Sequence, residues 1–379
     1  MASDAAADRP APVGVVIGAS DTRLWGMTAG ERLERSFRRA GVEPGPPSRA
    51  ARGGLIARGD YVMDEALIKA LAGKPGVLLT AEDGTPVAAH VVGAASAAMA
   101  ALEAGDADAP GLSDLQRTDV AGLGSAYNAA LRKREPPLLA PLTPQSVNAI
   151  EKRLFAASYK GVTDLVTKYA WPVPARIVTR WCAERKITPN QVTFAGFLLV
   201  LLAFWAFWNG DFALGLVAGW LMTFLDTVDG KLARVTLTSS KWGNIFDHGI
   251  DLIHPPFWWW AWWVGVQAGP HPLAPDIAPW VLASVTLLYA LQRAEEGIFM
   301  RLYGMHIHSW RPFDSWFRLI TARRNPNLIL LTLSLFIGRP DLGLLAVAAW
   351  TILSFLVHLV RLFQALATPR AKVVSWLSA

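Results

Sequence analysis

Long apolar segments separated by short loops fill the chain beyond about residue 190, and they constrain its fold more than any other feature. A transmembrane helix needs about 20 mostly apolar residues to cross the hydrocarbon core of a bilayer. Six segments fit this pattern, although the fifth is short: 191–209, 212–229, 244–267, 278–299, 326–338 and 342–364. We therefore predict an all-α polytopic membrane domain with six transmembrane helices over residues 191–366.

Basic residues are distributed unequally between the two sets of loops. The loops after the first, third and fifth segments contain one arginine between them, whereas the loops on the other side are rich in Lys and Arg. Such an excess marks the cytoplasmic side of a membrane protein. Six spans then place both termini in the cytoplasm, and the N-terminus lacks the basic and apolar regions of a signal peptide. We expect a multi-pass protein of a bacterial inner membrane.

The remaining segments differ in composition. Residues 1–110 alternate short apolar strands with helical stretches, which predicts a small soluble α/β domain. Residues 111–146 predict a linker, residues 147–190 predict amphipathic helices on the membrane surface, and residues 367–379 predict a cytoplasmic tail. The single cysteine, Cys182, excludes an internal disulfide framework. The net charge of +6 suits anionic lipid or a phosphate-bearing substrate and does not indicate nucleic acid.

Four aspartates lie at or near the ends of the second and third apolar segments. Asp226 and Asp229 are three residues apart, and Asp247 and Asp251 are four apart, so each pair lies on one face of a helix. Four carboxylates in one small volume repel one another unless a cation neutralises them. Carboxylate oxygens suit hard ions, so we predict Mg²⁺ or Mn²⁺ at this place, with two ions for four charges.

The residues between the two aspartate pairs suit a phosphate-bearing ligand. Gly230, Gly243 and Ala233 have little or no side chain, which allows a ligand or another backbone to come close. Lys231 and Arg234 add cationic groups beside the carboxylates, where a pyrophosphate can use them.

These residues form a motif that resembles the signature of the CDP-alcohol phosphotransferase (CDP-alcohol phosphatidyltransferase) family. The motif runs Asp226-xx-Asp229-Gly230-xx-Ala233-Arg234, then eight residues, then Gly243-xxx-Asp247-xxx-Asp251. The resemblance covers roughly residues 150–366. It implies six transmembrane helices around a polar cavity that opens to the cytoplasm, usually in a homodimer.

The resemblance also implies a reaction and a role for each residue of the motif. A CDP-linked donor transfers its phosphoalcohol group, phosphatidyl or phosphopolyol, to an acceptor hydroxyl and releases CMP, as in phospholipid biosynthesis. The four aspartates would hold the metal ions, and Asp251 would also be the general base on the acceptor. The residues implied at the cytidine diphosphate are Asp229, Gly230, Ala233, Arg234 and Gly243.

Basic residues on the predicted cytoplasmic side suggest a phosphorylated acceptor, such as an inositol or glycerol phosphate. Arg318, Arg323 and Arg324 lie in one loop, and guanidinium groups bind phosphate in bidentate fashion. The general excess of basic residues on that side is the alternative explanation. Lys160 lies in a segment similar to a surface helix of one family branch, so it contacts either the acceptor or lipid headgroups. The donor is either CDP-diacylglycerol or a soluble CDP-polyol.

Other polar residues in the membrane domain have alternative interpretations. Arg293 points into the cavity or pairs with Glu295 or Glu296. His254 is either a metal ligand or, more consistent with its depth, a hydrogen-bonded residue at a proline kink. Asp164 is expected near the mouth of the cavity.

The N-terminal stretch VVIGASDTRLWGMTAGERLERSF resembles the opening segment of sugar nucleotidyltransferases. Asp60 stands where that family has a metal-binding aspartate. The glycine-rich turn is shortened, and Glu31 and Arg32 replace the expected Pro-Lys, which removes groups that bind phosphate. We therefore interpret residues 1–110 as a degenerate nucleotidyltransferase-like domain, with an unrelated small α/β fold as the alternative.

Two other classes of function are compatible with buried carboxylates in a membrane domain. An ion transporter uses such groups along its ion path, and a non-catalytic membrane scaffold could retain them after losing activity. The aspartates cluster towards one predicted face of the membrane and the motif is intact. Both observations favour the phosphotransferase over these alternatives.

Overall fold

The computed structural model describes residues 12–18, 20–51, 53–124, 127–128, 131–239 and 241–378. For Tyr127, Lys241, Trp242, Asn244, Asp247 and His248 it describes only the backbone. The chain divides into two compact units. The first consists of Met1–Asn128, Arg134–Ser158 and Val235–Leu237, and the second of Ala129–Lys133, Tyr159–Arg234 and Thr238–Ala379.

The first unit is built on a mixed six-stranded sheet with the strand order β2-β1-β3-β6-β5-β7. Strand β1 is parallel to β2 and β3, β5 is parallel to β7, and β6 is antiparallel to both β3 and β5. The strands of this sheet are β1 (Val13–Ile17), β2 (Glu43–Pro44), β3 (Gly53–Arg58), β5 (Val77–Thr80), β6 (Pro86–Val92) and β7 (Gln116–Thr118).

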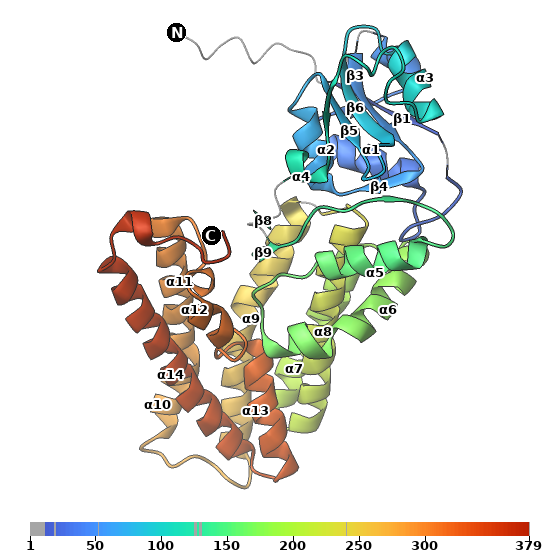
Figure 1. Ribbon diagram of the computed structural model, residues 1–379. Coiled ribbons are helices and arrows are strands. Elements are labelled where there is room, and N and C mark those ends of the chain that lie inside the picture. The colour runs from blue at the N-terminus through green and yellow to red at the C-terminus, as the bar shows by residue number, and fades with distance from the viewer. Residues whose placement is uncertain are drawn as a thin grey trace. The chain divides into compact units, whose positions relative to one another are not determined.

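Apolar side chains bury both faces of this sheet. In β3, Leu55 belongs to one hydrophobic cluster and the next residue, Ile56, to another, because successive side chains of a strand point to opposite faces. Helices α1 (Ala29–Arg39) and α2 (Glu65–Ala72) contribute to the Leu55 cluster, and α3 (Ser96–Ala104) contributes to the Ile56 cluster. The small α/β domain that composition predicts is present in this form (Figure 1).

Residues 111–128 and 134–158 differ from the predicted linker and surface helix, because they contribute to the first unit. Besides β7, this segment supplies β10 (Leu139–Pro141), which pairs with β4 (Tyr61–Met63). In helix α5 (Val147–Ala157), the buried Glu151 carboxylate accepts a hydrogen bond from the backbone N–H of Trp25 at 2.9 Å. The short elements α4 (Val120–Leu123), β8 (Tyr127–Asn128) and β9 (Lys133–Arg134) complete the segment.

The second unit is helical. Its elements are η2 (Val166–Ala170), α6 (Pro172–Glu184), α7 (Pro189–Trp208), α8 (Phe212–Val235), α9 (Lys241–Ala268), α10 (Ala278–Ala283), η3 (Ser284–Leu288), α11 (Tyr289–Tyr303), η4 (Ile307–Ser309), α12 (Pro312–Phe317), α13 (Arg324–Phe336), α14 (Pro340–Leu366) and η5 (Arg370–Lys372). Helix α7 begins at a capping box in which Thr188 and Gln191 satisfy each other's backbone N–H groups.

Three of these helices, α7, α8 and α14, are long and apolar enough to cross a membrane, within the part of the chain that the structure describes. They correspond to the first, second and sixth predicted spans. The other predicted spans are also helical, as α9, as the consecutive α10, η3 and α11, and as α13, which has 13 residues. The chain is therefore an integral membrane protein, and the number of six spans stays a prediction.

Helix α8 continues to Val235, whereas the apolar pattern predicted an end near residue 229. Lys231, Leu232, Ala233 and Arg234 favour helix, so the single glycine at 230 does not end it. Asp226 and Asp229 therefore lie inside the helix and not at its end.

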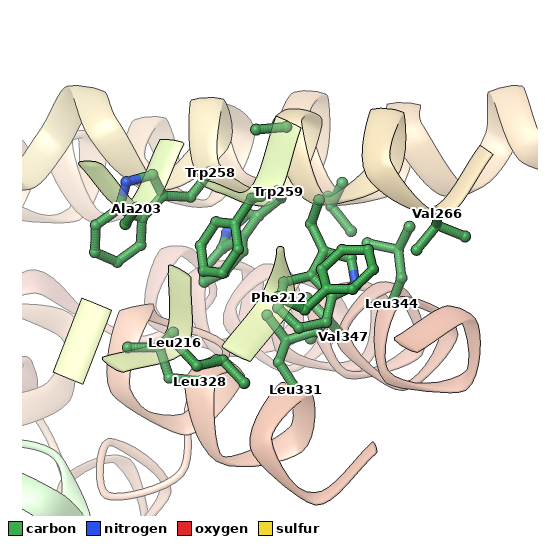
Figure 2. Packing of buried hydrophobic residues seen from close by; sticks show 14 of the residues in the cluster. Ala203, Phe212, Leu216, Trp258, Trp259, Val266, Leu328, Leu331, Leu344 and Val347 are labelled. Atoms are coloured by element: carbon green, nitrogen blue, oxygen red, sulfur yellow. The ribbon is translucent and has the colours of Figure 1, made fainter. Parts of the chain in front are cut away.

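Large aromatic side chains fill the core between four helices of the second unit. Trp258 and Trp259 of α9 pack with Phe212 of α8, Leu328 of α13 and Val347 of α14 (Figure 2). These five side chains are almost completely buried. The core fixes α8, α9 and α13 relative to one another, and these three helices carry the polar residues described next.

Candidate functional site

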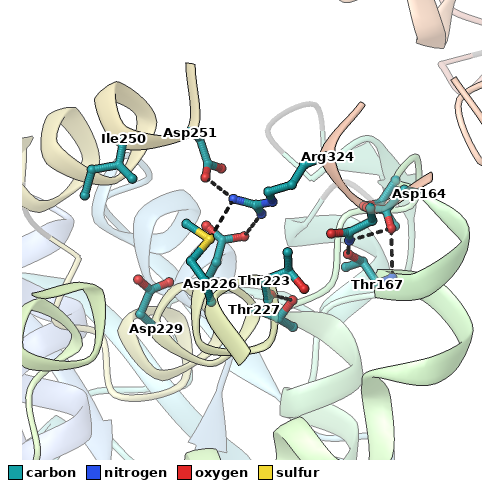
Figure 3. A network of polar contacts seen from close by, with 12 residues as sticks. Asp164, Thr167, Thr223, Asp226, Thr227, Asp229, Ile250, Asp251 and Arg324 are labelled. Carbon is teal, nitrogen blue, oxygen red and sulfur yellow. Dashed lines mark hydrogen bonds and ion pairs between the residues drawn. The ribbon is translucent and has the colours of Figure 1, made fainter. Parts of the chain in front are cut away.

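Two of the predicted metal-binding aspartates face each other across a single guanidinium group. Arg324, the first residue of α13, donates from Nη2 to Asp226 Oδ2 at 2.6 Å and from Nη1 to Asp251 Oδ1 at 2.5 Å (Figure 3). Asp226 comes from α8 and Asp251 from α9. The sequence prediction that these two helices direct carboxylates towards one place holds for this pair.

Asp229 lies one helical turn beyond Asp226 and has a different partner. The Thr193 hydroxyl of α7 donates to Asp229 Oδ2 at 2.5 Å, and Asp229 is 3% exposed. Both aspartates line one small pocket, whose lining residues are Thr193, Gly196, Met222, Asp226, Asp229 and Ile250. A Cβ atom at Gly196 would meet no atom within 4 Å, so a glycine here leaves the pocket open.

The family resemblance implies that several residues after Asp229 contact the cytidine diphosphate, and these residues lie on α8 and at the start of α9. Arg234 extends back over Gly230, because a Cβ atom on Gly230 would lie 3.0 Å from Arg234 Nη2. Ala233 lies on the same turn, with its carbonyl accepting the Thr238 N–H. Gly243 lies in the first turn of α9. The side chain of Asp247 lies outside the described part of the structure, so its predicted role as a metal ligand stays a prediction.

Lys231, which follows Gly230, is buried among aromatic groups. Its Nζ atom lies 3.8 Å from the centre of the Tyr159 ring, and the residue is 4% exposed. A buried ammonium beside a ring is stabilised by the negative face of the π system. Lys160, the next residue after Tyr159, is half-buried.

The arginines predicted to bind an acceptor phosphate do not share the same partners. Arg324 contacts the aspartates, whereas the adjacent Arg323 pairs with Glu296 of α11. Burial lowers the pKa of the Arg318 guanidinium well below its ordinary value, and the like charge of the neighbouring Arg323 acts in the same direction. Arg318 and Arg323 therefore lie close enough to influence each other, with Arg324 directed towards α8 and α9.

Glu296 is the centre of a second polar cluster beside the aspartates. Arg293 of the same helix pairs with it at 2.7 Å, which selects one of the two predicted alternatives for Arg293. His308 Nε2 lies 3.2 Å from Glu296 Oε1, and His358 Nδ1 lies 3.9 Å from the same atom. Burial lowers the pKa of the His308 imidazole well below its ordinary value, so this ring is neutral at physiological pH.

The donor atoms of Glu296, His308 and His358 lie within 4.8 Å of one another, an arrangement that could hold a metal ion. Two guanidinium groups already pair with Glu296, however, and they would repel a second cation. Both ring nitrogens of His358, which is 2% exposed, have no hydrogen-bond partner among the described residues. The surplus of N–H donors and positive charge suits a bound anion better than a metal ion.

Asp164 connects the segment before η2 to the start of α13. Its Oδ1 atom accepts hydrogen bonds from the Asn325 side-chain amide at 2.9 Å and from the Thr167 N–H at 3.0 Å. Figure 3 shows this contact as a second network beside that of Arg324. Asp164 therefore helps to fix the backbone that carries Arg324.

Thr193, His308 and His358 were not among the residues predicted from the sequence. Their spacing from the residues that they contact follows no helical period, so no local signal indicated them. His254 has the predicted hydrogen bond: its Nδ1–H donates to the Ile250 carbonyl at 2.7 Å, beside Pro255 inside α9.

The apolar helices and the carboxylates buried among them define an integral membrane protein with a polar site between α7, α8, α9 and α13. Residues 186–301 match the family model described as CDP-alcohol phosphatidyltransferase. This match confirms the resemblance to the CDP-alcohol phosphatidyltransferase family that the aspartate motif predicted. The match includes all four aspartates and leaves out residues 1–185 and Arg318, Arg323 and Arg324.

Three curated relatives illustrate the similarity. Cholinephosphotransferase 1 of Gallus gallus is 29% identical over 154 residues, which are 36% of this chain and 42% of that protein. Archaetidylinositol phosphate synthase of Pyrococcus horikoshii is 40% identical over 78 residues, 21% of this chain and 42% of that protein. Ethanolaminephosphotransferase 1 of Homo sapiens is 30% identical over 128 residues, 29% of this chain and 31% of that protein. The chain thus spans less than half the length of each of these relatives.

Proposed function

We propose that this protein transfers a phosphoalcohol group from a CDP-alcohol to an acceptor hydroxyl and releases CMP. The observation that carries the proposal is the meeting of Asp226 and Asp251 from two helices at one guanidinium group, beside a pocket that Asp226 and Asp229 line, inside the family match. A buried group of carboxylates is costly in a membrane protein and indicates a function.

In the proposed reaction, the acceptor oxygen forms a bond to the phosphorus that carries the alcohol group. The bond between that phosphorus and the oxygen of CMP breaks, and CMP leaves with the bonding electrons. Asp251 accepts the proton of the acceptor hydroxyl. Its side chain is 39% exposed, so a hydroxyl group can approach it, and a carboxylate within hydrogen-bonding distance is a competent general base.

The carboxylates of this site fit a divalent cation. Asp226, Asp229 and Asp251 offer only oxygen donors, which suit Mg²⁺ or Mn²⁺, and Asp247 is proposed as the fourth ligand. When bound, such ions neutralise charge that develops on the phosphoryl oxygens. The chain's own residues hold the carboxylates ready, through the Thr193 hydroxyl and the Arg324 guanidinium.

We propose that the acceptor carries a phosphate group. Arg318 and Arg323, with the Glu296 cluster beside them, supply guanidinium and imidazole N–H groups next to the aspartates. Glu296 orients the two arginines that pair with it. A phosphorylated polyol such as inositol phosphate or glycerol phosphate has the charge to use these donors, and Lys160 is proposed as a further contact.

On the donor side, Asp229, Gly230, Ala233, Arg234 and Gly243 are proposed to bind the cytidine diphosphate.

We further propose that six membrane spans surround a cavity that opens to the cytoplasm. Both termini lie on that side of a bacterial inner membrane, and the protein forms a homodimer. In α6, Val173, Ile177 and Trp181 are exposed at helical spacing, which supports a position on the membrane surface. The first unit is proposed as a degenerate nucleotidyltransferase-like accessory domain.

The direct test is a screen of purified full-length protein for CMP release with Mg²⁺ or Mn²⁺. CDP-diacylglycerol and soluble CDP-polyols serve as donors, each with matched pairs of free and phosphorylated polyols. The proposal predicts CMP release that requires the metal and is faster with the phosphorylated member of a pair. Equal rates within every pair would contradict the phosphorylated acceptor, and ion flux in vesicles without CMP release would favour the transporter alternative.

A further inference from the structure

The Arg324 guanidinium pairs with two carboxylate oxygens that the proposed metal site would use to bind a cation. Its two terminal nitrogens contact Asp226 Oδ2 and Asp251 Oδ1 at 2.6 and 2.5 Å. The Arg324 side chain is 14% exposed, so this double ion pair is screened only weakly by solvent. A cation that binds between these two aspartates must compete with Arg324.

Among the ion pairs of the described residues, those of Arg324 are with Asp226 and Asp251. Asp229 takes its hydrogen bond from Thr193, which has no charge and can remain in place when a cation binds. The neighbouring Arg323 pairs with Glu296 instead. The additional contact of Arg324 Nη1, with Met222 Sδ at 3.4 Å, is a weak one. The Arg324 side chain can therefore move away from the aspartates while the Thr193–Asp229 hydrogen bond and the Arg323–Glu296 ion pair stay in place.

We propose that Arg324 is an exchangeable counter-ion of Asp226 and Asp251. It pairs the two carboxylates before the divalent cation binds, and the cation displaces it. This inference rests on the metal site of the proposed function. The side chains of Asp226 and Asp251 are 20% and 39% exposed, and neighbouring carboxylates without a counter-ion repel each other. A built-in counter-ion therefore stabilises the unloaded site. The same pairing must weaken metal binding, because part of the cation's interaction free energy is used to break the ion pair that it displaces.

The inference makes opposite predictions for stability and for metal affinity. Loss of the guanidinium at position 324 lowers the stability of the metal-free protein, because Asp226 and Asp251 then repel each other. It raises the affinity for the cation, because nothing has to be displaced. By linkage, added metal then stabilises the variant more than it stabilises the wild type.

The test uses the full-length protein in detergent, with free Mn²⁺ measured by electron paramagnetic resonance and Tm by tryptophan fluorescence. Arg324→Gln should bind Mn²⁺ about tenfold more tightly than the wild type, the scale of a charge-assisted pair. Its Tm should be lower without Mn²⁺ and should rise further on adding it. Arg323→Gln is the matched control, since it removes the same charge one residue away, and its Mn²⁺ affinity should stay within about twofold of the wild type.

Two more variants make the outcome decisive. Arg324→Lys keeps one charge but cannot bridge both carboxylates, so its affinity should lie between those of the wild type and Arg324→Gln. Adding Asp226→Asn to Arg324→Gln should remove the gain. Equal Mn²⁺ affinity in the wild type and both Arg324 variants would overturn the inference and leave the proposed function standing. Absence of Mn²⁺ binding in all of them would overturn the metal site and the inference together.

Discussion

At the scale of single residues, the site depends on hydrogen bonds between side chains that are far apart in the sequence. Asp229 is held by the Thr193 hydroxyl across 36 residues, and Asp226 by Arg324 across 98 residues. Each of these contacts joins two helices. The orientations of Asp226 and Asp229 therefore depend on a neighbour on another helix.

Replacing Thr193 by Val should disturb the proposed metal site while keeping the shape of the side chain. Asp229 is buried, so loss of the Thr193 donor costs about 1–3 kcal/mol and removes a contact that orients the carboxylate. We expect the Mg²⁺ concentration for half-maximal CMP release to rise about tenfold, the lower end of the range for residues that orient metal ligands.

Thr193→Ser is the matched control, because it retains the hydroxyl and should restore the wild-type metal requirement. An unchanged requirement in Thr193→Val would show that this hydrogen bond does not position Asp229.

Asp164 makes the stability of the second unit depend on pH. Burial acts to raise the pKa of this carboxyl, but the charge of Arg318 and hydrogen bonds from Thr167 and Asn325 outweigh it and lower the pKa below its ordinary value. A carboxyl group with a lowered pKa stabilises the fold above its unfolded pKa of about 4, and that stability is lost as the pH falls through the folded value.

The measurement for Asp164 is Tm between pH 7 and pH 3 for the wild type and Asp164→Asn. We expect the variant to be less stable at pH 7 and to lose less of its stability on acidification. Parallel curves would mean that Asp164 does not contribute to the acid sensitivity of the fold.

The sequence predicted the residues of the aspartate site better than their partners. The spacing of Asp226, Asp229 and Asp251 within their segments matches the period of an α-helix, and this period can be recognised in the local sequence. Thr193 and His358 become relevant only through tertiary packing, which a single sequence does not encode in any local pattern. Arg323 and Arg324, which are adjacent in the sequence, have different partners, and no local pattern indicated this difference.

At the scale of helices, α7 and α9 approach each other closely. A Cβ atom on Gly265 of α9 would lie 2.3 Å from the carbonyl oxygen of Phe207 at the end of α7. Small residues allow such contacts between membrane helices. The apolar pattern located both helices, but it could not indicate which glycine marks their contact.

Gly265→Ala should therefore separate the two helices and destabilise the protein by about 1–3 kcal/mol, the usual cost of overpacking. Gly297→Ala in α11 is the matched control, because its Cβ atom would meet nothing within 4 Å. That change should be neutral or stabilising by up to about 1 kcal/mol. Thermal unfolding in detergent compares the two, and equal Tm values would contradict the close contact.

At the scale of the whole molecule, the chain consists of an α/β unit that ends at Ser158 and a helical unit that begins at Tyr159, apart from short segments at 129–133 and 235–237. The composition predicted both units but placed a linker at 111–146. Polar and proline-rich sequence favours loops, and it does not reveal that two short strands, β7 and β10, pair with partners far away in the sequence.

If the first unit is an accessory domain, deletion of residues 1–158 should leave measurable CMP release. The cut belongs after Ser158, because α5 would otherwise remain without Trp25, whose backbone N–H donates to Glu151. Activity should persist at a reduced level, together with a cooperative unfolding transition. Complete loss of activity in a truncated protein that still unfolds cooperatively would mean that the first unit takes part in catalysis.

The central claim is that Asp226 and Asp251 serve one phosphotransfer site, and CMP release by Asp251→Asn tests it most directly. Asp276→Asn, which changes an exposed aspartate in the loop before α10, is the control. Loss of a general base costs about 10²-fold to 10⁴-fold in rate. The account predicts such a loss for Asp251→Asn, a comparable loss for Asp226→Asn and no loss for the control. Full CMP release by a folded Asp251→Asn protein would contradict it.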